Sequence, residues 1–514
     1  MQPESTPEAQ DLSVTGESGT VLLRGGLIAD VESRRLIRGD IAIEGGRIRE
    51  VFAADDNRGA PASMIDLRGC VIVPGLVNAH THSYAPLGRH VGPGLPLEPW
   101  MMHSWANTIG RTPEETYLSA ILQGIEALTT GTTTLLDHLG GDISVMSAAL
   151  KAYDDLGIRA VLAPMVTDMV LPETVGVPTE EWPAAARARD GVFIRSDAAD
   201  LLAMTEDLHT EWHGHADRLS VFLGPSGPQR CSISMLEQVA QLADKLDVGV
   251  HTHLLETRAQ AAIPVPAGER SWVRTLASAG LLTPRLSVAH GVWLSEQDMQ
   301  ELSAAGVSIV HNPQSNLQLG SGIGQLHRWR RHRLPVALGT DGVNCGGSMD
   351  MLSSMRLAAI LHRPGLADPR DWESPWSVLD SATRGGAQAL SVTDIGNVRP
   401  GMRADLSAFE MAGTAFATHE DPIASLVLTS YDHRARIVMV GGRTVVRDGI
   451  VQTVDVEAAI EQAAEMHAHL MARNSRYADV ARAQEKFLTK ISGAATPNRD
   501  MMAFSAPQEG DVSE

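Results

Sequence analysis

The segment Val71–Ser83 reads VIVPGLVNAHTHS, an apolar run, a Pro-Gly break, a second apolar run and then two histidines. Side chains two residues apart on a strand project from the same side, so His80 and His82 can reach one metal ion. The same spacing recurs elsewhere in this chain, so the spacing alone is weak evidence. The position of this pair at the end of a buried-strand pattern, where side chains emerge into the mouth of a barrel or sheet, favours a metal site.

Working outward from this segment, apolar stretches alternate with helical patterns over 74–398. Stretches such as GTTTLLDH, RAVLAPMV, VGVHTHLLE and PVALGTDG end in polar residues. This strand-helix order predicts a parallel sheet, and its length suits an α/β fold of the (β/α)8 barrel type. A doubly wound open sheet is the alternative, but no G-x-G-x-x-G turn follows a strand. The stretch 171–212, rich in Pro, Ala and charge, is predicted to be a loop or helical insert over the barrel mouth, and the sequence leaves open whether it is a lid.

Short alternating segments at both ends of the chain, 20–73 and 399–453, predict a small β-sandwich domain that brackets the barrel. Residues 1–19 are polar and lack periodicity, which predicts a disordered leader. Residues 454–490 have helical periodicity, and 491–514 lose it, which predicts a C-terminal helical segment followed by a flexible tail.

Composition limits the partners. The formal net charge is -20 and the acidic residues are scattered, which argues against nucleic acid, because phosphate binding needs a concentrated basic face. The three cysteines lie far apart without C-x-x-C spacing, so neither a disulfide scaffold nor a thiolate zinc site is expected, and a reducing cytoplasm fits. No apolar run has transmembrane length and the N-terminus lacks signal-peptide character, so we expect neither a membrane partner nor export.

Polar residues follow four more strand patterns: His253 with Glu256 in HTHLLET, His290 in VAHG, His311 with Asn312 in HNPQSN, and Asp341 in LGTDG. A mononuclear hydrolytic centre needs three or four N/O ligands, an open position for water and a group that shuttles protons. Asp341 is suited to accept the proton of a metal-activated water, and Glu256 is suited to deliver one to a leaving group or ring nitrogen. The alternative for Glu256 is a carboxylate that only favours a helix N-terminus.

The ordered motifs PGLVNAHTH, HLLET, AHG, HNPQSN and LGTDG resemble the amidohydrolase superfamily, in particular the branch of adenosine-type and S-adenosylhomocysteine deaminases, guanine deaminase and s-triazine chlorohydrolases. The resemblance runs from about Thr20 to Val451. It implies a distorted (β/α)8 barrel with a β-sandwich formed by both termini, a homo-oligomer, and one divalent metal ion, with zinc preferred over iron or manganese. It implies the metal ligands His80, His82, His253 and Asp341, with His290 near the hydrolytic water and Glu256 as the acid that protonates substrate nitrogen.

Lysine gives a useful contrast. The chain has four lysines, and none lies at a strand end. The dihydroorotase and hydantoinase branch of the superfamily bridges two metals with a carboxylated lysine at the fourth strand, where this chain has LGPSGPQRC. The absence of that lysine favours one metal over two and weakens a cyclic-amidase function.

The fourth-strand segment also departs from the nucleoside-deaminase pattern, which carries a histidine and a tyrosine where this chain has Ser226 and Gln229. LPLEPWM is similar to a tryptophan-containing loop of the deaminase branch, with an extra Pro99. Indole can stack on a planar ring, and Gln or Arg can bind ring nitrogens and oxygens. The predicted substrate contacts are therefore Trp100, Gln229, Arg230, His311 and Asn312. A buried anchor is the alternative for Trp100, and a loop-shaping turn is the alternative for the last two.

Two more histidines are interpreted as follows. His251 is expected to be structural or to support a metal ligand, because the superfamily register places the ligand at the second histidine of HTH. His138 follows the second strand, where a pocket role and a solvated loop are both open.

The first functional hypothesis is a hydrolase that deaminates a nitrogen heterocycle of the purine, pterin, pyrimidine or triazine kind. Water activated by the metal attacks an amidine-like ring carbon, and ammonia or an amine leaves. The second hypothesis keeps the site and changes the leaving group, which gives an s-triazine-type chlorohydrolase or an N-dealkylating aminohydrolase. The third is a barrel that binds without catalysis, which predicts a missing ligand, whereas the sequence shows none missing.

Overall fold

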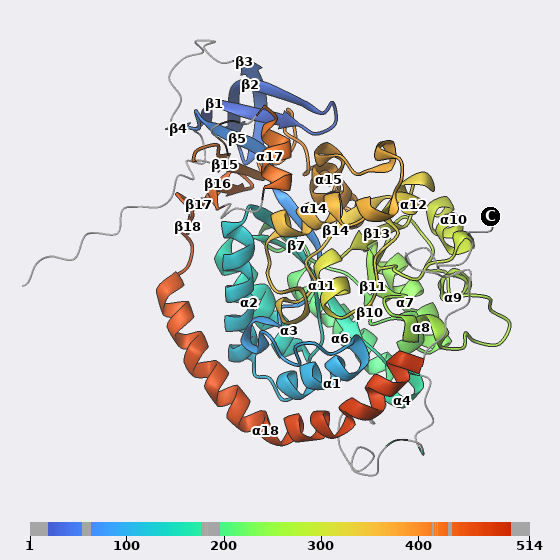
Figure 1. Cartoon of the computed structure of the whole chain (residues 1–514). Coiled ribbons are helices and arrows are strands. Elements are labelled where there is room, and N and C mark those ends of the chain that lie inside the picture. The colour runs from blue at the N-terminus through green and yellow to red at the C-terminus, as the bar shows by residue number, and fades with distance from the viewer. Residues whose placement is uncertain are drawn as a thin grey trace, which may run out of the picture.

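The computed structural model describes residues 19–53, 63–175, 180, 182, 196–413, 416, 418, 420–429 and 434–494 (Figure 1). Of the predicted leader, 1–19, only Gly19 falls within the described residues. Of the predicted tail, 491–514, only 491–494 do.

A ring of parallel strands forms the centre of the molecule. One sheet holds β6 (Leu76–Thr81), β7 (Thr132–Leu139) and β8 (Arg159–Val166), with β9 (Leu219–Val221) and β10 (Gly224–Pro225) both beside β8. A second sheet holds β11 (Val250–Leu254), β12 (Leu286–His290), β13 (Ser308–His311) and β14 (Val336–Leu338). A parallel bridge between Leu223 and Val250 joins the sheets on one side. On the other side, the backbone N–H of Asp341 donates to the carbonyl of His80 at 3.0 Å. The closed ring confirms the predicted barrel and excludes the doubly wound alternative.

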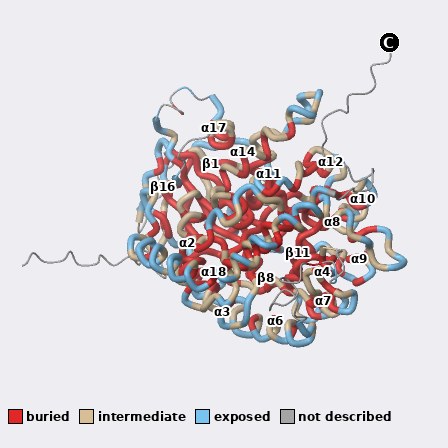
Figure 2. The backbone as a smooth tube through the Cα atoms, turned by 60° about the horizontal axis from the view of Figure 1, so that its bottom comes forward, coloured by how far each residue is buried: buried red, intermediate tan, exposed pale blue. Residues whose placement is uncertain are grey.

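Helices cover the outside of this ring (Figure 1). Their buried faces and the strands form one large hydrophobic core, and Figure 2 shows the buried residues gathered along the strands. The α-helices of the barrel are α1 (Leu97–Thr108), α2 (Pro113–Thr129), α3 (Ile143–Leu156), α4 (Leu171–Thr174), α6 (Ala198–Trp212), α7 (Ile233–Leu246), α8 (Arg258–Ala262), α9 (Trp272–Ser278), α10 (Glu296–Ala304), α11 (Pro313–Gln318), α12 (Leu326–Arg331), α13 (Val343–Gly346), α14 (Met351–Ile360), α15 (Pro375–Asp380) and α16 (Gly386–Ala389).

Local sequence sets the helix ends. Helix α2 begins with a capping box, in which the Thr112 hydroxyl accepts from the Glu115 N–H and the Glu115 carboxylate accepts from the Thr112 N–H. Helix α3 begins at the Asp142 cap and ends at Gly157, whose φ of 72° is a left-handed conformation that glycine adopts without strain.

Strands from both ends of the chain pair in one sheet at the top of Figure 1. In order these strands are β18 (Ile450–Val451), β17 (Arg443–Arg447), β16 (Ala435–Val440), β15 (Leu406–Glu410), β5 (Cys70–Pro74), β1 (Val21–Asp30), β2 (Arg35–Glu44) and β3 (Arg47–Ala53), with β4 (Ser63–Asp66) also beside β1. The two ends meet where β5 and β15 run antiparallel. The sheet has its own hydrophobic core. Alternating segments joined by short Gly-containing turns are typical of an antiparallel sheet, but here β1 runs parallel to both β4 and β5.

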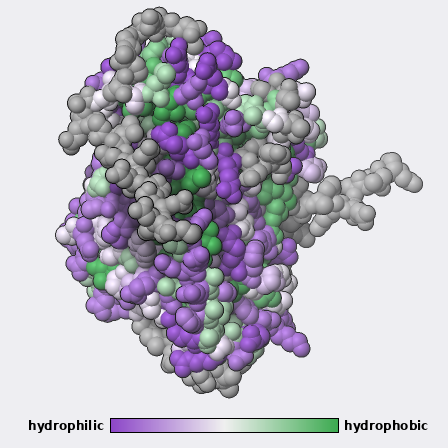
Figure 3. Space-filling view, turned by 90° about the vertical axis from the view of Figure 1, so that its left-hand side faces the viewer, coloured by the Kyte–Doolittle hydropathy of each residue, from purple (hydrophilic) through white to green (hydrophobic). Residues whose placement is uncertain are grey.

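Two helices lie outside the barrel order. Helix α17 (Pro422–Leu428) follows β15, and helix α18 (Val456–Ala494) runs along the outside of the barrel past α2 and α1 (Figure 1). Helix α18 continues beyond the predicted end at residue 490. The face in Figure 3 is mainly hydrophilic, with hydrophobic residues scattered on it. Within the described part of the chain, no helix is both long and apolar enough to cross a bilayer.

The second part of the stretch 171–212, helix α6, does not lie over the barrel mouth as predicted. Helix α6 packs against α3 and β9 on the outside of the barrel, where it buries Leu202, Thr205 and Leu208. This part is an outer barrel helix, because its apolar face needs the barrel wall to cover it. Among the described residues of the stretch, Leu171, Thr174 and Ser196 line the cavity described below.

A buried ion pair ties the barrel to the terminal sheet. Arg159 of β8 places Nε 2.9 Å from Oδ2 of Asp405, just before β15, and the two side chains are 6% and 1% exposed. The same carboxylate accepts a hydrogen bond from the Gly441 N–H at 2.6 Å, in the turn between β16 and β17. Removing one partner of such a pair leaves an uncompensated buried charge.

We therefore expect Arg159→Met to lower the free energy of unfolding by about 3–5 kcal/mol. Urea-induced unfolding followed by circular dichroism measures the change. The matched control is Arg370→Met, which removes an arginine that pairs with Asp368 on the surface and should leave the unfolding curve unchanged. The same loss in both variants, or no loss in either, would contradict the buried pair's role.

Candidate active site

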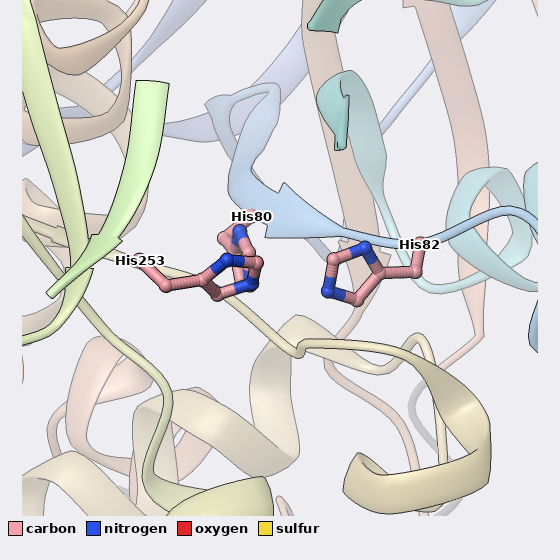
Figure 4. Close-up of side chains that lie close together, drawn as sticks. All are labelled: His80, His82 and His253. Carbon is pink, nitrogen blue, oxygen red and sulfur yellow. The ribbon is translucent and has the colours of Figure 1, made fainter. Parts of the chain in front are cut away.

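Three histidines meet at the carboxyl ends of the barrel strands. His80 lies on β6, His82 follows that strand and His253 lies on β11, and Figure 4 shows the three rings close together. One nitrogen from each ring lies within 4.8 Å of the other two. Asp341 follows β14 and places Oδ1 3.3 Å from Nε2 of His82 and 3.7 Å from Nε2 of His80. All four predicted ligands are buried, so the structure brings the predicted set together.

Backbone carbonyls orient two of the rings. Nδ1 of His82 donates to the carbonyl of His138 at 2.6 Å, and Nδ1 of His253 donates to the carbonyl of Ser226 at 2.6 Å. A carbonyl can only accept, so the ring proton sits on Nδ1 and the lone pair sits on Nε2. Both lone pairs are thereby available in the shared space.

A side chain orients the third ring. Nδ1 of His80 lies 2.8 Å from Nε2 of His251, whose own Nδ1 lies 2.8 Å from the Ser287 hydroxyl. Nε2 of His80 is buried and has no hydrogen-bond partner. A buried nitrogen without a partner is costly unless something binds it. His251 thus supports a ligand, as the sequence predicted.

These donors fit a divalent metal ion. Burial lowers the pKa of His80 and of His253 well below the ordinary value, so both rings are neutral near pH 7 and can donate lone pairs. Three imidazole nitrogens and a carboxylate form an N/O set that suits zinc and other first-row ions. His80, His290 and Asp341 form a second overlapping group with ligand atoms within 4.8 Å.

A proton-transfer group lies beside these donors. Nδ1 of His290 lies 2.9 Å from Oδ1 of Asn316, and Nε2 lies 3.8 Å from both Oε2 of Glu256 and Oδ2 of Asp341. Burial raises the pKa of Glu256, so this carboxyl holds a proton to higher pH than an exposed one. Burial also acts to raise the pKa of Asp341, but His82 and then His290 hold it below its ordinary value. Two neighbouring carboxyls with pKa values moved apart suit an acid and a base.

The backbone is strained at this site. Asp341 and His290 have φ values of 62° and 74°, which are left-handed conformations. Each such residue costs on the order of 1–3 kcal/mol and persists only where its surroundings fix it. For Asp341, the Gly342 N–H donates to Oδ1 at 2.7 Å in addition to the barrel-closing bond to His80.

A cavity of about 580 Å³ opens over these groups. Two of the predicted substrate contacts, Trp100 and Arg230, line it. Trp100 lies on helix α1 rather than in a loop and is 6% exposed, so one face is packed and the rest meets the cavity. Arg230 is half-buried, and its guanidinium lies 3.2 Å from the Ser226 hydroxyl.

The other three predicted contacts do not line the cavity. Gln229 is buried in the short turn Pro228–Arg230 and points elsewhere. His311 packs its ring against Trp329 at a centroid distance of 5.4 Å. Asn312 lies below the site, where Nδ2 is 3.5 Å from Nδ1 of His290. Its surroundings suit support of His290 better than direct substrate contact.

The structure adds Tyr84 and Arg111, which the sequence did not single out, and it places His138, whose role the sequence left open. The ring of Tyr84 stacks on His82 at 5.0 Å and also lines the cavity. Tyr84 lies two residues after His82, but in the turn that follows β6, so strand alternation could not have placed it. Its closeness to the HTH motif is the signal that the sequence offers. His138 is fully buried and stacks on His253 at 4.9 Å, which excludes the solvated-loop alternative. Burial lowers the pKa of His138 to about 3. Arg111 also lines the cavity, and nothing in its sequence neighbourhood marks it.

A closed (β/α)8 barrel with a buried set of histidines and a carboxylate at the carboxyl ends of its strands defines the class of metal-dependent barrel hydrolases. Within that class, the chain belongs to the amidohydrolase family, whose family model matches residues 71–445. This confirms the resemblance seen in the ordered motifs.

The similar proteins include both deaminases and a chlorohydrolase. The chain is 33% identical over 433 residues to a 5-methylthioadenosine/S-adenosylhomocysteine deaminase of Desulforudis audaxviator, which covers 83% of this chain and 93% of the relative. An adenosine deaminase structure from Xanthomonas campestris with bound zinc is 27% identical, has a TM-score of 0.79 and covers 88% of this chain and 98% of its own. A zinc complex of an atrazine chlorohydrolase from Arthrobacter aurescens is 25% identical, has a TM-score of 0.77 and covers 87% and 100%.

We expect His82→Ala to reduce bound divalent metal from about one ion per chain to nearly none, because the site loses a nitrogen donor that nothing nearby replaces. Elemental analysis after dialysis measures the content. His469→Ala is the matched control, since His469 belongs to another H-x-H pair but is exposed on α18. Unchanged metal in His82→Ala would exclude the assigned site.

Proposed function

We propose that this protein is a metal-dependent hydrolase that deaminates a nitrogen heterocycle of the adenosine type. The observation that carries the proposal is His290, whose Nε2 lies 3.8 Å from two carboxyls beside the converging nitrogens of the three histidines. The relatives named as deaminases of adenosine-like compounds support the same chemistry. A barrel that only binds would not need the acid Glu256 beside the proposed metal ligands.

His80, His82, His253 and Asp341 are the proposed ligands of one divalent ion, and the zinc bound in similar structures supports zinc over iron or manganese. Such an ion would lower the pKa of a coordinated water toward neutrality.

The proton route follows from the remaining groups. Oδ2 of Asp341 is suited to take the proton of the attacking water and to pass it to the departing amine, with His290 placed to steady the charge on Asp341. The protonated carboxyl of Glu256 is suited to protonate the ring nitrogen next to the attacked carbon. Water adds at that carbon, the carbon–nitrogen bond to the exocyclic amine breaks, and ammonia leaves. The remaining proton of the added hydroxyl returns to Glu256 as the ring carbonyl forms, which restores the acid.

Trp100 and Arg230 are the proposed contacts to the heterocycle, because both line the cavity over the site. The other three predicted contacts are proposed to support the residues of the cavity wall without touching the substrate themselves: Gln229, His311 and Asn312. A cytoplasmic location stays a proposal supported by the three buried free cysteines, which a reducing compartment preserves. A homo-oligomeric assembly stays a prediction from the family resemblance.

An s-triazine hydrolase is the second candidate. The segment after the fourth strand carries Ser226 and Gln229 in place of the histidine and tyrosine of the nucleoside-deaminase pattern, and several similar structures are triazine hydrolases. The same water, acid and base would then release chloride or an alkylamine.

A panel of aminopurine nucleosides, aminopterins, aminopyrimidines and chloro- or amino-s-triazines, assayed for released ammonia, amine and chloride, separates the candidates. We expect ammonia from adenine nucleosides. Chloride or alkylamine from triazines alone would favour the second candidate, and turnover of lactams or esters alone would contradict both.

We also expect Glu256→Gln to lower kcat/KM by about 10²–10⁴-fold, because the amide cannot donate the carboxyl proton. Metal content should stay at the level of the unaltered protein. The control is Glu296→Gln, an exposed glutamate that pairs with Arg328. Stopped assays of ammonia release decide the matter, and a near-normal rate in Glu256→Gln would remove this residue from the mechanism.

A further inference from the structure

Two arginines, Arg111 and Arg230, line the cavity in a chain whose formal net charge is -20. Arg230 contacts the Ser226 hydroxyl at 3.2 Å and the Met101 thioether at 2.9 Å. Among the described residues, Arg111 has no hydrogen-bond partner for any of its three guanidinium nitrogens, all of which are buried. Within the described residues, neither arginine forms an ion pair with a carboxylate.

The carboxylate that acts electrostatically on Arg111 already binds other groups. Glu115 acts electrostatically on Arg111, but Arg473 of α18 holds the Glu115 carboxylate in a two-pronged contact of 2.9 and 3.0 Å. Oε2 of Glu115 also accepts from the Thr112 N–H at 2.9 Å, within the capping box of α2. Helix α18 thus takes the carboxylate that would otherwise neutralise Arg111.

The Arg111 side chain is positively charged near pH 7. Burial lowers its pKa to about 10, so the guanidinium is still protonated near pH 7. It presents planar N–H donors that no protein group accepts, and an unpaired buried charge is costly. A guanidinium left in this condition beside a cavity matches the geometry of carboxylate and phosphate oxygens.

We propose that Arg111 is the binding site for an anionic group, a carboxylate or a phosphate, carried on the substrate away from the reacting ring. The inference rests on the proposed function and narrows its substrate class to nitrogen heterocycles that carry an anionic substituent. A cavity of about 580 Å³ lies within the range that holds a ring together with such a substituent. Tyr84 lies between the two ends of the site, since it stacks on His82 and acts electrostatically on Arg111.

The test compares neutral and anionic partners of the same ring. 5-Methylthioadenosine is set against S-adenosylhomocysteine for a carboxylate, and adenosine against adenosine 5-monophosphate for a phosphate. Dissociation constants are measured by titration calorimetry on metal-loaded Glu256→Gln protein, and kcat and KM on protein with Glu256. We expect one anionic member to bind at least about tenfold tighter than its neutral partner, the size of one charge-assisted hydrogen bond. The pair that shows the preference identifies the anion.

Variants then assign the preference. Arg111→Met should reduce the anionic-over-neutral ratio at least about tenfold, and Arg111→Lys should retain part of it. Arg274→Met is the matched control, because Arg274 lies outside the cavity lining and pairs with Glu301. It should leave the ratio unchanged. Circular dichroism and metal content establish folding, and Arg111→Lys alone decides the matter if Arg111→Met does not fold.

Different results would overturn the anion site at Arg111 and the proposed deaminase function. Ammonia release without preference for an anionic member, or equal losses for both members in Arg111→Met, would overturn the anion site and leave the proposed function standing. No ammonia from any compound would overturn the proposed function, and calorimetry would still decide the anion site by the binding ratio. If no anionic compound binds, the proposed anion site is also overturned.

Discussion

The convergence of three imidazole lone pairs on one buried point is the constraint on which the site depends. It requires each ring to carry its proton on the far nitrogen. The carbonyls of His138 and Ser226 fix this for His82 and His253, and His251 fixes it for His80. Each of these partners comes from a different barrel strand or the loop after it, so the ring orientations depend on the barrel being closed. A rotated ring would present an N–H where a lone pair is needed.

Two buried carboxyls in the same cavity have pKa values that are shifted in opposite directions. Glu256 and Asp341 are almost equally buried, at 3% and 4% exposure, yet their pKa values move in opposite directions. The difference comes from the neighbours. His82 lies 3.3 Å from Asp341, whereas the nearest histidine nitrogen to Glu256 is that of His290 at 3.8 Å, and the Asp341 carboxylate itself acts to raise the pKa of Glu256. One fold thereby holds an acid and a base a few ångströms apart without either being exposed to bulk water.

The barrel and the group of proposed metal ligands could be predicted because strand order fixes the position of both. Polar residues at the ends of parallel strands meet at one edge, so His80, His82, His253 and Asp341 had to approach one another once the strands were recognised. The H-x-H spacing did not suffice by itself, since His213, His215, His467 and His469 share it and are exposed. Substrate contacts were harder to predict. Gln229 and Arg230 are adjacent in a tight turn, so only one of them faces the cavity, and period-two reasoning does not apply there. Arg111 could not be found, because its isolation depends on Arg473, far away in the sequence, binding Glu115.

The pairing of β5 with β15 has a consequence for biosynthesis. β5 ends at Pro74 and its partner begins at Leu406, so the edge of the first sheet segment remains open while the whole barrel emerges from the ribosome. An open strand edge is a template for other chains. Contacts between distant parts of a chain also form slowly. The nascent protein therefore passes through a long interval in which its N-terminal strands need shielding, and chaperone demand should fall sharply only when the last strands have been synthesised.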